Sequence, residues 1–287
     1  MVNHSIVAED LTYWYGELVA VDHINFDVED GEILGFLGPN GAGKSTTWKM
    51  LTGQMKPKGG RATVLGRDIA REPEEVQGEI GVCFEYTNLY EQMSAAENLK
   101  LFARLFGIKG LDAEALLKRV GLEGWGKYKV GEFSKGMKQR LMVARSLVNR
   151  PRILFLDEPT SGLDPVSAET IRGVVLEERD RGATVFLTTH DMFEADKLSD
   201  RVAFINQGKI VALDTPHNLK QTYGKRALKA QVEGGDGLEY REIPLDEAGT
   251  ADAMRNLFSE NKVVTIHSEE ATLEDIFIKI TGRGLQA

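Results

Sequence analysis

The sequence predicts an α/β fold in which helices cover a sheet of mostly parallel strands. Two observations predict it. Short apolar runs that are typical of buried strands recur along the chain with helical patterns between them, at 33–37, 80–84, 153–156 and 184–188. A glycine-rich segment follows the first run and leads directly into a helical pattern. Of the 287 residues, 42% are hydrophobic, which is enough for a packed core.

The chain opens with β-like runs in which apolar and polar residues roughly alternate, at 6–8, 11–15 and 24–28. We expect an antiparallel β region there. A helix through Met50 follows the glycine-rich segment, and a strand at 62–65 comes after a glycine-rich corner.

Helical patterns dominate from Ser94 to about Val148. Leu99, Phe102 and Phe106 fall on one helix face, as expected for a helix that packs on one side. We therefore predict an inserted helical subdomain at about 87–150. The strands at 153–156 and 184–188 then return with a helix between them, which completes the α/β core.

The composition changes beyond Gly224. β-like runs and helical runs alternate there around an acidic glycine-rich turn, at 228–232, 251–258, 263–266 and 273–280. The sequence predicts a large domain at 1–223 and a small C-terminal α/β domain at 224–287.

Charge and cysteine content limit the class of protein. The formal net charge of −9 argues against a sequence-independent nucleic-acid binder, which needs Lys and Arg to neutralise phosphates. Cys83 is the single cysteine, and its apolar surroundings favour a small buried hydrophobe over a redox role. No long apolar run or leader pattern occurs, so we expect a cytoplasmic protein.

The segment GPNGAGKST at 38–46 has the pattern of a P-loop, which holds nucleotide phosphates. Its glycines let backbone N–H groups turn towards phosphates, and the helix that follows directs its positive end at them. Lys44 would reach the β- and γ-phosphates, and the Ser45 hydroxyl would bind Mg²⁺. A chance glycine-rich turn is the alternative, but the strand before and the helix after favour the P-loop. The candidate nucleotide-binding residues are Gly38, Asn40, Gly41, Gly43, Lys44, Ser45 and Thr46.

Two acids end the buried run at 153–156. Asp157 and Glu158 would lie at the carboxyl edge of the sheet, where open α/β sheets bind ligands. We expect Asp157 to hold Mg²⁺ and Glu158 to polarise the attacking water. Taken alone, adjacent acids after a strand are commonly a solvated turn; the upstream P-loop favours the catalytic interpretation.

Further motifs follow in a fixed order, beginning with FSKGMKQR at 133–140. Over about residues 5–220 the chain resembles the nucleotide-binding subunits of ATP-binding-cassette (ABC) transporters. The resemblance implies a P-loop NTPase (RecA-like) core and ATP with Mg²⁺ as cofactors. It also implies that Ser134 and Gly136 contact the γ-phosphate of ATP held by another subunit. Lys135 and Met137 depart from the usual Gly and Gln, and without the family Ser134 is simply a helix N-cap.

The same resemblance assigns three more residues. His190, in the segment at 188–191, matches a switch histidine that bonds the γ-phosphate, and Tyr15 matches the aromatic that stacks on adenine. Ser161-Gly-Leu-Asp164 matches a dimer-contact loop. Glu85 stands where the family normally has a glutamine that ligates Mg²⁺ and senses the transmembrane partner. Either Glu85 is a metal ligand or it turns towards solvent or the permease.

The C-terminal region resembles a narrower group. Residues 271–277, ATLEDIF, are similar to the C-terminal extension of exporter ATPases of the daunorubicin-resistance type. An amphipathic helix capped by Thr272 is a compatible structural interpretation.

The resemblance implies an ATPase that works as a dimer, a homodimer or a heterodimer of nucleotide-binding subunits, and drives transport. With no membrane-spanning segment in the sequence, it would energise the separate transmembrane permease of an exporter from the inner face of the cell membrane. The alternative is a soluble ABC ATPase that acts on ribosomes or DNA. Such proteins carry a second cassette or a long coiled coil, and neither pattern is present in this sequence.

Overall fold

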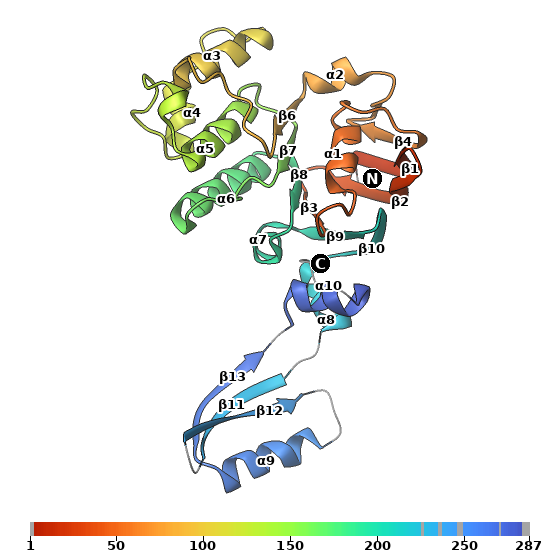
Figure 1. Ribbon diagram of the computed structural model, residues 1–287, viewed down its shortest axis with the longest axis vertical. Coiled ribbons are helices and arrows are strands. Elements are labelled where there is room, and N and C mark those ends of the chain that lie inside the picture. Colours follow the sequence, from red (N-terminus) through yellow and green to blue (C-terminus); the bar gives the residue numbers. More distant parts are fainter. Residues whose placement is uncertain (1–2, 225–226, 235–236, 246–248, 270, 283–287) are drawn as a thin grey trace. The chain divides into compact units, whose positions relative to one another are not determined.

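The computed structural model describes residues 3–224, 227–234, 237–245, 249–269 and 271–282 (Figure 1). Contacts within the chain divide it into two units, Met1–Leu213 and Asp214–Ala287. The first unit holds an antiparallel sheet, a larger sheet with a parallel centre, and a group of helices.

The larger sheet has six strands. Its order is β10 (Lys209–Asp214), β9 (Arg201–Asn206), β3 (Ile33–Leu37), β8 (Thr184–Thr189), β7 (Ile153–Asp157) and β6 (Ile80–Cys83). β3 runs parallel to β8 and β9, and β7 runs parallel to β6 and β8. All residues of β3, β7 and β8 are buried, which explains their continuous apolar runs. Their carboxyl ends meet at one edge, so side chains that follow them come together.

The second sheet is antiparallel. Its order is β2 (Leu18–Glu29), β1 (His4–Tyr15), β4 (Gly59–Val64) and β5 (Arg67–Asp68). Phe26 on β2 contacts Phe36 and Phe186 of the parallel strands, with ring centroids 5.6 and 6.1 Å apart. These aromatic contacts join the two sheets in one core, to which Trp48 and Leu51 also belong.

Helices surround the parallel strands in Figure 1. The helices of the first unit are α1 (Lys44–Leu51), α2 (Pro73–Gln77), α3 (Ala95–Leu105), α4 (Ala113–Arg119), α5 (Lys135–Ser146), α6 (Pro165–Asp180) and α7 (Met192–Leu198), with a 3₁₀ turn at Val130–Glu132. α3, α4 and α5 fall inside the segment predicted as helical at about 87–150, and they share an apolar core with the sheet. Ser94 caps α3 in a capping box with Glu97. The predicted α/β fold with an antiparallel β region and a helical insertion is confirmed.

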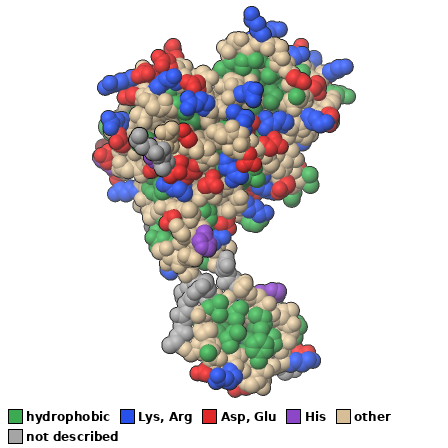
Figure 2. All heavy atoms as spheres, turned by 180° about the vertical axis from the view of Figure 1, so that it is seen from behind, with side chains coloured by type: hydrophobic (Ala, Val, Ile, Leu, Met, Phe, Trp, Pro, Cys, Tyr) green, Lys and Arg blue, Asp and Glu red, His purple; other side chains and the backbone are tan. Residues whose placement is uncertain are grey.

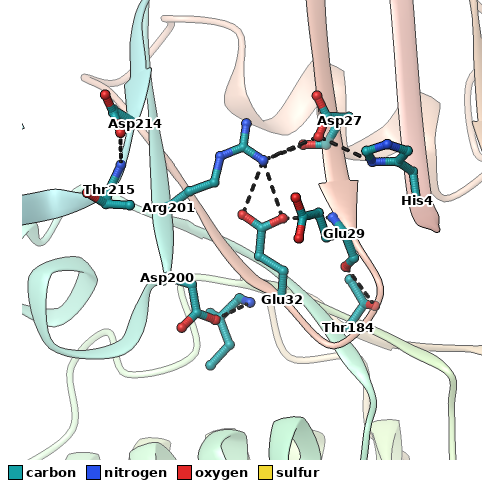
Figure 3. A network of polar contacts seen from close by, with 10 residues as sticks. His4, Asp27, Glu29, Glu32, Thr184, Asp200, Arg201, Asp214 and Thr215 are labelled. Atoms are coloured by element: carbon teal, nitrogen blue, oxygen red, sulfur yellow. Dashed lines mark hydrogen bonds and ion pairs between the residues drawn. The ribbon is translucent and has the colours of Figure 1, made fainter. Parts of the chain in front are cut away.

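Polar contacts hold the amino-terminal ends of the parallel strands (Figure 3). Arg201, at the start of β9, lies 3.3 Å from Asp27 and 3.4 Å from Glu32. Burial raises the pKa of Glu32, while the backbone N–H of Glu29 and the charge of Arg201 oppose that effect. The Thr184 hydroxyl, at the start of β8, accepts a hydrogen bond from the N–H of Gly31 at 2.9 Å. The turn between β2 and β3 is thereby fixed to the starts of β8 and β9, at the sheet edge opposite the P-loop.

The described residues of the second unit form a three-stranded sheet and three helices. The sheet order is β12 (Gly237–Pro244), β11 (Ala227–Gly234) and β13 (Val263–Glu269); the helices are α8 (Pro216–Tyr223), α9 (Thr250–Glu260) and α10 (Leu273–Thr281). Leu257 of α9 packs on Ala230, Val232 and Ile243. Thr272 caps α10 with Asp275 as its capping-box partner.

The division of the structure lies earlier in the chain than the domain boundary expected near Gly224. The two boundaries differ because α8 packs against α10 and so belongs to the second unit. The Lys279 ammonium donates a hydrogen bond to the carbonyl of Tyr223 at 2.7 Å, which ties the end of α8 to α10. A change of composition marks where the strands of this unit begin, but α8 precedes that change.

Candidate active site

The P-loop connects the end of β3 to the start of α1. Gly43 occupies the N-cap of α1 with φ 114°, and a Cβ there would lie 2.5 Å from the carbonyl oxygen of Ala20. A Cβ on Gly38 would lie 2.2 Å from the carbonyl oxygen of Ile205. Both positions exclude any side chain, since the loop is pressed against β2 and β9. The first N–H groups of α1 therefore face outward at the carboxyl edge of the sheet.

The Lys44 side chain folds back over this loop. Its ammonium donates hydrogen bonds to the carbonyl oxygens of Gly38 and Pro39, the latter at 3.2 Å. Burial lowers the pKa of Lys44, whereas the charges of Glu158, Asp157 and Glu85 raise it. The cation thus lies in a field of three carboxylates and is held by neutral carbonyls, which it can exchange for phosphate oxygens.

Asp157 ends β7 and is 7% exposed. The Thr188 hydroxyl on the neighbouring β8 donates a hydrogen bond to its carboxylate. Burial raises the pKa of Asp157, the Thr188 bond lowers it, and the charge of Glu85 raises it further. Thr188 therefore stabilises a charged carboxylate that the buried site would otherwise disfavour.

Glu158 is bonded on both carboxylate oxygens. Its Oε1 lies 2.8 Å from Nδ1 of His190, and its Oε2 accepts a hydrogen bond from the Thr189 hydroxyl at 3.2 Å. The Glu158 backbone has φ 50°, in the left-handed region that residues with a side chain rarely adopt. The unusual backbone turns the carboxylate towards the end of β8, where His190 is positioned.

These groups surround one polar cavity of about 310 Å³. It brings together most of the residues that the sequence singled out: Tyr15, Asn40, Gly41, Gly43, Lys44, Ser45, Thr46, Glu85, Asp157, Glu158 and His190. Gly38, the first residue of the loop, packs against Ile205 and does not line the cavity. Ser134 and Gly136 do not line it either: Ser134 caps α5 and accepts a hydrogen bond from the N–H of Met137 at 3.2 Å.

Thr188 and Thr189 had no assigned role in the sequence. Their hydroxyls bond Asp157 at the end of β7 and Glu158 directly after it, across adjacent strands. Two hydroxyl residues at the end of an otherwise apolar strand are the signal that could have indicated this.

Aromatic residues stand at the cavity mouth. The Tyr15 ring is 46% exposed and packs edge-on against Tyr13, with centroids 4.9 Å apart. Lys58 lies over the rings of Tyr13 and Trp14, at 4.8 and 5.3 Å. Tyr15 therefore offers a partly exposed ring at the cavity, while Tyr13 and Trp14 hold Lys58.

The donors at this site suit a small hard cation. Ser45, Asp157 and Glu85 present only oxygen atoms, the ligand type that Mg²⁺ prefers. No group of three or more His, Cys, Asp or Glu side chains able to hold a metal occurs among the described residues. A cation here would thus depend on phosphate oxygens for much of its coordination, as Mg²⁺ does in nucleotide sites.

Within the described part of the chain, no helix is long and apolar enough to cross a membrane.

Comparison with known proteins identifies the family. The ABC transporter family matches residues 21–161. The fluoroquinolones export ATP-binding protein of Mycobacterium tuberculosis H37Rv is 46% identical over 278 residues, covering 96% of this chain and 92% of its own. A daunorubicin resistance ATP-binding protein of Streptomyces coeruleorubidus is 37% identical, covering 98% and 96%.

A solved dimeric ATP-binding cassette in a post-hydrolysis state, bound to ADP and Pi, is 27% identical with a TM-score of 0.67, covering 73% of this chain and 98% of its own. None of these names supports a soluble cassette that acts on ribosomes or DNA. The fold, the P-loop and the relatives agree: this chain belongs to the ABC transporter family and is an ATP-binding, ATP-hydrolysing subunit of the type found in drug exporters.

Proposed function

We propose that this ATPase energises an exporter by docking on a separate transmembrane permease, with hydrolysis carried out by the residues of the polar cavity. The observation that carries the proposal is the Glu158–His190 pair, 2.8 Å apart, beside Lys44 and Asp157. A carboxylate held by a histidine at the edge of a phosphate site is suited to accept a proton from water.

Each residue then has a distinct task. Lys44 and the N–H groups of the loop bind the β- and γ-phosphates, and Tyr15 stacks on adenine. Ser45, Asp157 and Glu85 would hold Mg²⁺, which neutralises charge on the phosphates. Glu158 accepts the proton of the attacking water, and His190 orients Glu158 and donates towards the γ-phosphate.

Ser134 and Gly136 complete the site from a second subunit, identical or different. Ser134 and Gly136 lie at the start of α5, a helix of 12 residues, outside this chain's own cavity. A helix start with a small hydroxyl suits a phosphate, because N–H groups and the helix dipole favour negative charge. ATP would join two subunits, and hydrolysis would release them.

This chain has a surface on which the permease could dock. A mostly apolar cleft of about 230 Å³ lies between β6, α3 and α5, and Phe84, Phe102 and Phe106 line it. Figure 2 shows hydrophobic side chains gathered on this part of the first unit. Phe106 is 40% exposed, although a side chain of that type usually gains by burial. A helix or loop of the permease could fill the cleft, which would place the ATPase on the inner face of the membrane.

The cleft is linked to the ATP site. Phe84 immediately precedes Glu85, and its ring packs edge-on against Trp48 of α1, with centroids 5.3 Å apart. A partner that moves Phe84 would therefore act on both the metal site and the helix that follows the P-loop.

Co-purification of the tagged chain with a membrane protein from solubilised membranes of its own cells tests the proposal. We expect the wild-type chain to form a complex and to hydrolyse ATP faster in it. Phe106→Glu should abolish the complex and leave the basal ATPase activity of the isolated chain unchanged. Full complex formation by Phe106→Glu would exclude the cleft as the docking surface, and an ATPase rate that no membrane partner alters would contradict the transport function.

A further inference from the structure

A second hollow lies on the first unit, away from the ATP site and built by other residues than the docking cleft. Its volume is about 330 Å³, and it lies where α3 ends and the chain turns towards α4. Lys100, Ala103, Arg104, Ile108, Lys109, Gly110 and Leu111 line it. Its floor is apolar, and every charged residue in its wall is a cation.

The three cations have no assigned work inside the protein. Among the described residues, Lys100, Arg104 and Lys109 make no ion pair or side-chain hydrogen bond. The nearest acids in sequence are already used: Glu97 accepts from the N–H of Ser94, and Asp112 accepts from the N–H of Ala115. The charge of Lys100 also acts on Glu97, without a direct ion pair. Three positive charges around one hollow, in a chain of net charge −9, attract an anion with several oxygen atoms.

An exposed apolar side chain stands beside these cations. Leu105, in the last turn of α3, is 70% exposed, and Gly107 then turns the chain with φ 71°. A lone exposed leucine is ordinary on a protein surface. Here it follows Arg104 directly in α3, one helix position away from the lining of the hollow, to which Ala103, Ile108 and Leu111 contribute apolar side chains. Cations combined with an exposed apolar residue are typical of surfaces that bind the interface of an anionic membrane.

We propose that this hollow binds the phosphate headgroup of an anionic membrane lipid. Lys100, Arg104 and Lys109 donate hydrogen bonds to the phosphate oxygens, and Leu105 enters the interfacial region of the bilayer. A soluble phosphate would use the cations alone, and the exposed leucine is the reason for choosing the lipid. The interaction is separate from permease docking, which uses Phe102 and Phe106 in the other cleft, so the two proposals can fail independently.

Vesicle binding by the full chain, without nucleotide or permease, tests this proposal. The wild-type protein is floated with vesicles of phosphatidylcholine alone and with vesicles that contain phosphatidylglycerol as well, at low salt. We expect binding only to the anionic vesicles, and weaker binding as salt screens the charges. Replacing all three cations, by Lys100→Gln, Arg104→Gln and Lys109→Gln together, should lower the partition coefficient roughly a hundredfold, since each basic residue near such a surface contributes about fivefold.

A charge-matched variant controls for net charge. Lys56→Gln, Lys127→Gln and Arg150→Gln together remove three exposed cations elsewhere on the first unit. This variant should retain vesicle binding within about threefold, because charges distant from the surface are screened. Equal losses in both triple variants would show a general charge effect and overturn the proposal. Equal binding of the wild type to neutral vesicles, or no binding to anionic ones, would overturn it as well.

A single substitution separates a lipid from a soluble anion. Leu105→Gln should weaken vesicle binding about tenfold, because the transfer of an apolar side chain of this size is worth about that factor. Inorganic phosphate at millimolar concentration should compete only weakly. If Leu105→Gln binds vesicles like the wild type while phosphate displaces them fully, the hollow is a site for a soluble anion and the lipid proposal is wrong.

Discussion

At the scale of single residues, the backbone of Glu158 is the most unusual feature of the site. A φ of 50° costs on the order of 1 kcal/mol for a residue with a side chain, and here it directs the carboxylate to His190. The bond to Thr189 fixes the second oxygen. This strained backbone is consistent with a role in which the orientation of the Glu158 carboxylate matters more than the contribution of Glu158 to stability.

Glu158→Gln should reduce ATP turnover by at least about 10²-fold and leave ATP affinity unchanged, because the water loses its proton acceptor and the phosphates lose no contact. ATP should then trap a stable dimer, visible by size-exclusion chromatography. Turnover above about a tenth of the wild-type rate would remove Glu158 from the role of general base.

Glu85 gives a second prediction at this scale. It lines the cavity with Lys44 and Asp157, and it is exposed, so water screens its charge. A carboxylate ligates Mg²⁺ but repels phosphate when the metal is absent. Two charges about 4 Å apart in water interact by about 1 kcal/mol, or roughly fivefold in affinity. Glu85→Gln should therefore raise ATP affinity in EDTA by about that factor and flatten the Mg²⁺ dependence of hydrolysis. Identical metal dependence in both proteins would mean that Glu85 is not a ligand.

The sequence was informative about residues whose spacing is local. The P-loop and the acids after β7 are short motifs, and the structure brings them to one cavity. The partners from other strands, Thr188 and Thr189, depend on which strands are neighbours, and a single sequence does not specify that order. Ser134 and Gly136 remain predictions, because their expected contact lies on another subunit.

At the scale of elements, helix caps and strand ends determine where the functional side chains lie. Asp164 begins α6: its Oδ1 accepts from the N–H groups of Val166 and Ser167, and its Oδ2 accepts from the Ser167 hydroxyl at 2.6 Å. The Ser167 hydroxyl and these backbone bonds hold the pKa of Asp164 below its usual value.

That shift predicts a pH dependence. Because the pKa of Asp164 is lower in the folded than in the unfolded chain, its charge stabilises the fold above the unfolded pKa, and this is lost as the pH falls through the folded value. Asp164→Asn keeps an oxygen acceptor but does not titrate. The difference in thermal midpoint between wild type and variant should be largest at neutral pH and shrink towards about pH 3. A difference that stays constant over this range would show that the Asp164 charge has no part in capping.

Elements with strong periodicity were predictable, and short or half-buried ones were not. The buried strands β3, β7 and β8 coincide with the apolar runs, and α10 with the pattern at 273–280. The sequence analysis did not identify β9, although residues 202–205 of that strand are buried, and it did not identify β10 or β12. β10 is the outer strand of its sheet and is only partly buried, and most of β12 is exposed, so neither has a continuous apolar run.

At the scale of the whole molecule, the sheet of the second unit has a face opposite the one on which α9 packs. Ala230 and Val232 face α9, and Tyr240 lies on the opposite face, where its hydroxyl accepts a hydrogen bond from Gln231. Leu238 and Tyr240 are 54% and 75% exposed, and Figure 2 shows hydrophobic side chains gathered on this unit. Without a chemical motif of its own, such a surface is suited to protein contacts.

We therefore expect the second unit to stabilise the dimer between ATP cycles. A chain that ends at Asp214 removes α8 together with α10, whose buried faces depend on each other. It should fold and bind ATP, yet associate roughly tenfold more weakly without nucleotide, a loss of about 1.4 kcal/mol. Sedimentation of the two chains in the absence of nucleotide measures this. The same monomer fraction for both would assign the second unit another task.

Because Trp48 contacts Phe84, the intrinsic fluorescence of Trp48 can report on changes at this contact. The chain has three tryptophans: Trp48 is 1% exposed, whereas Trp14 and Trp125 are 38% and 41% exposed. An aqueous quencher such as iodide would suppress the emission of the two exposed indoles and leave that of Trp48. The Trp48 indole nitrogen is buried without a hydrogen-bond partner among the described residues, so its emission should lie at short wavelength and shift to the red if water or a polar group reaches it. Occupation of the cleft or of the P-loop could then be followed by fluorescence in the unlabelled wild-type protein, on the timescale of a single turnover.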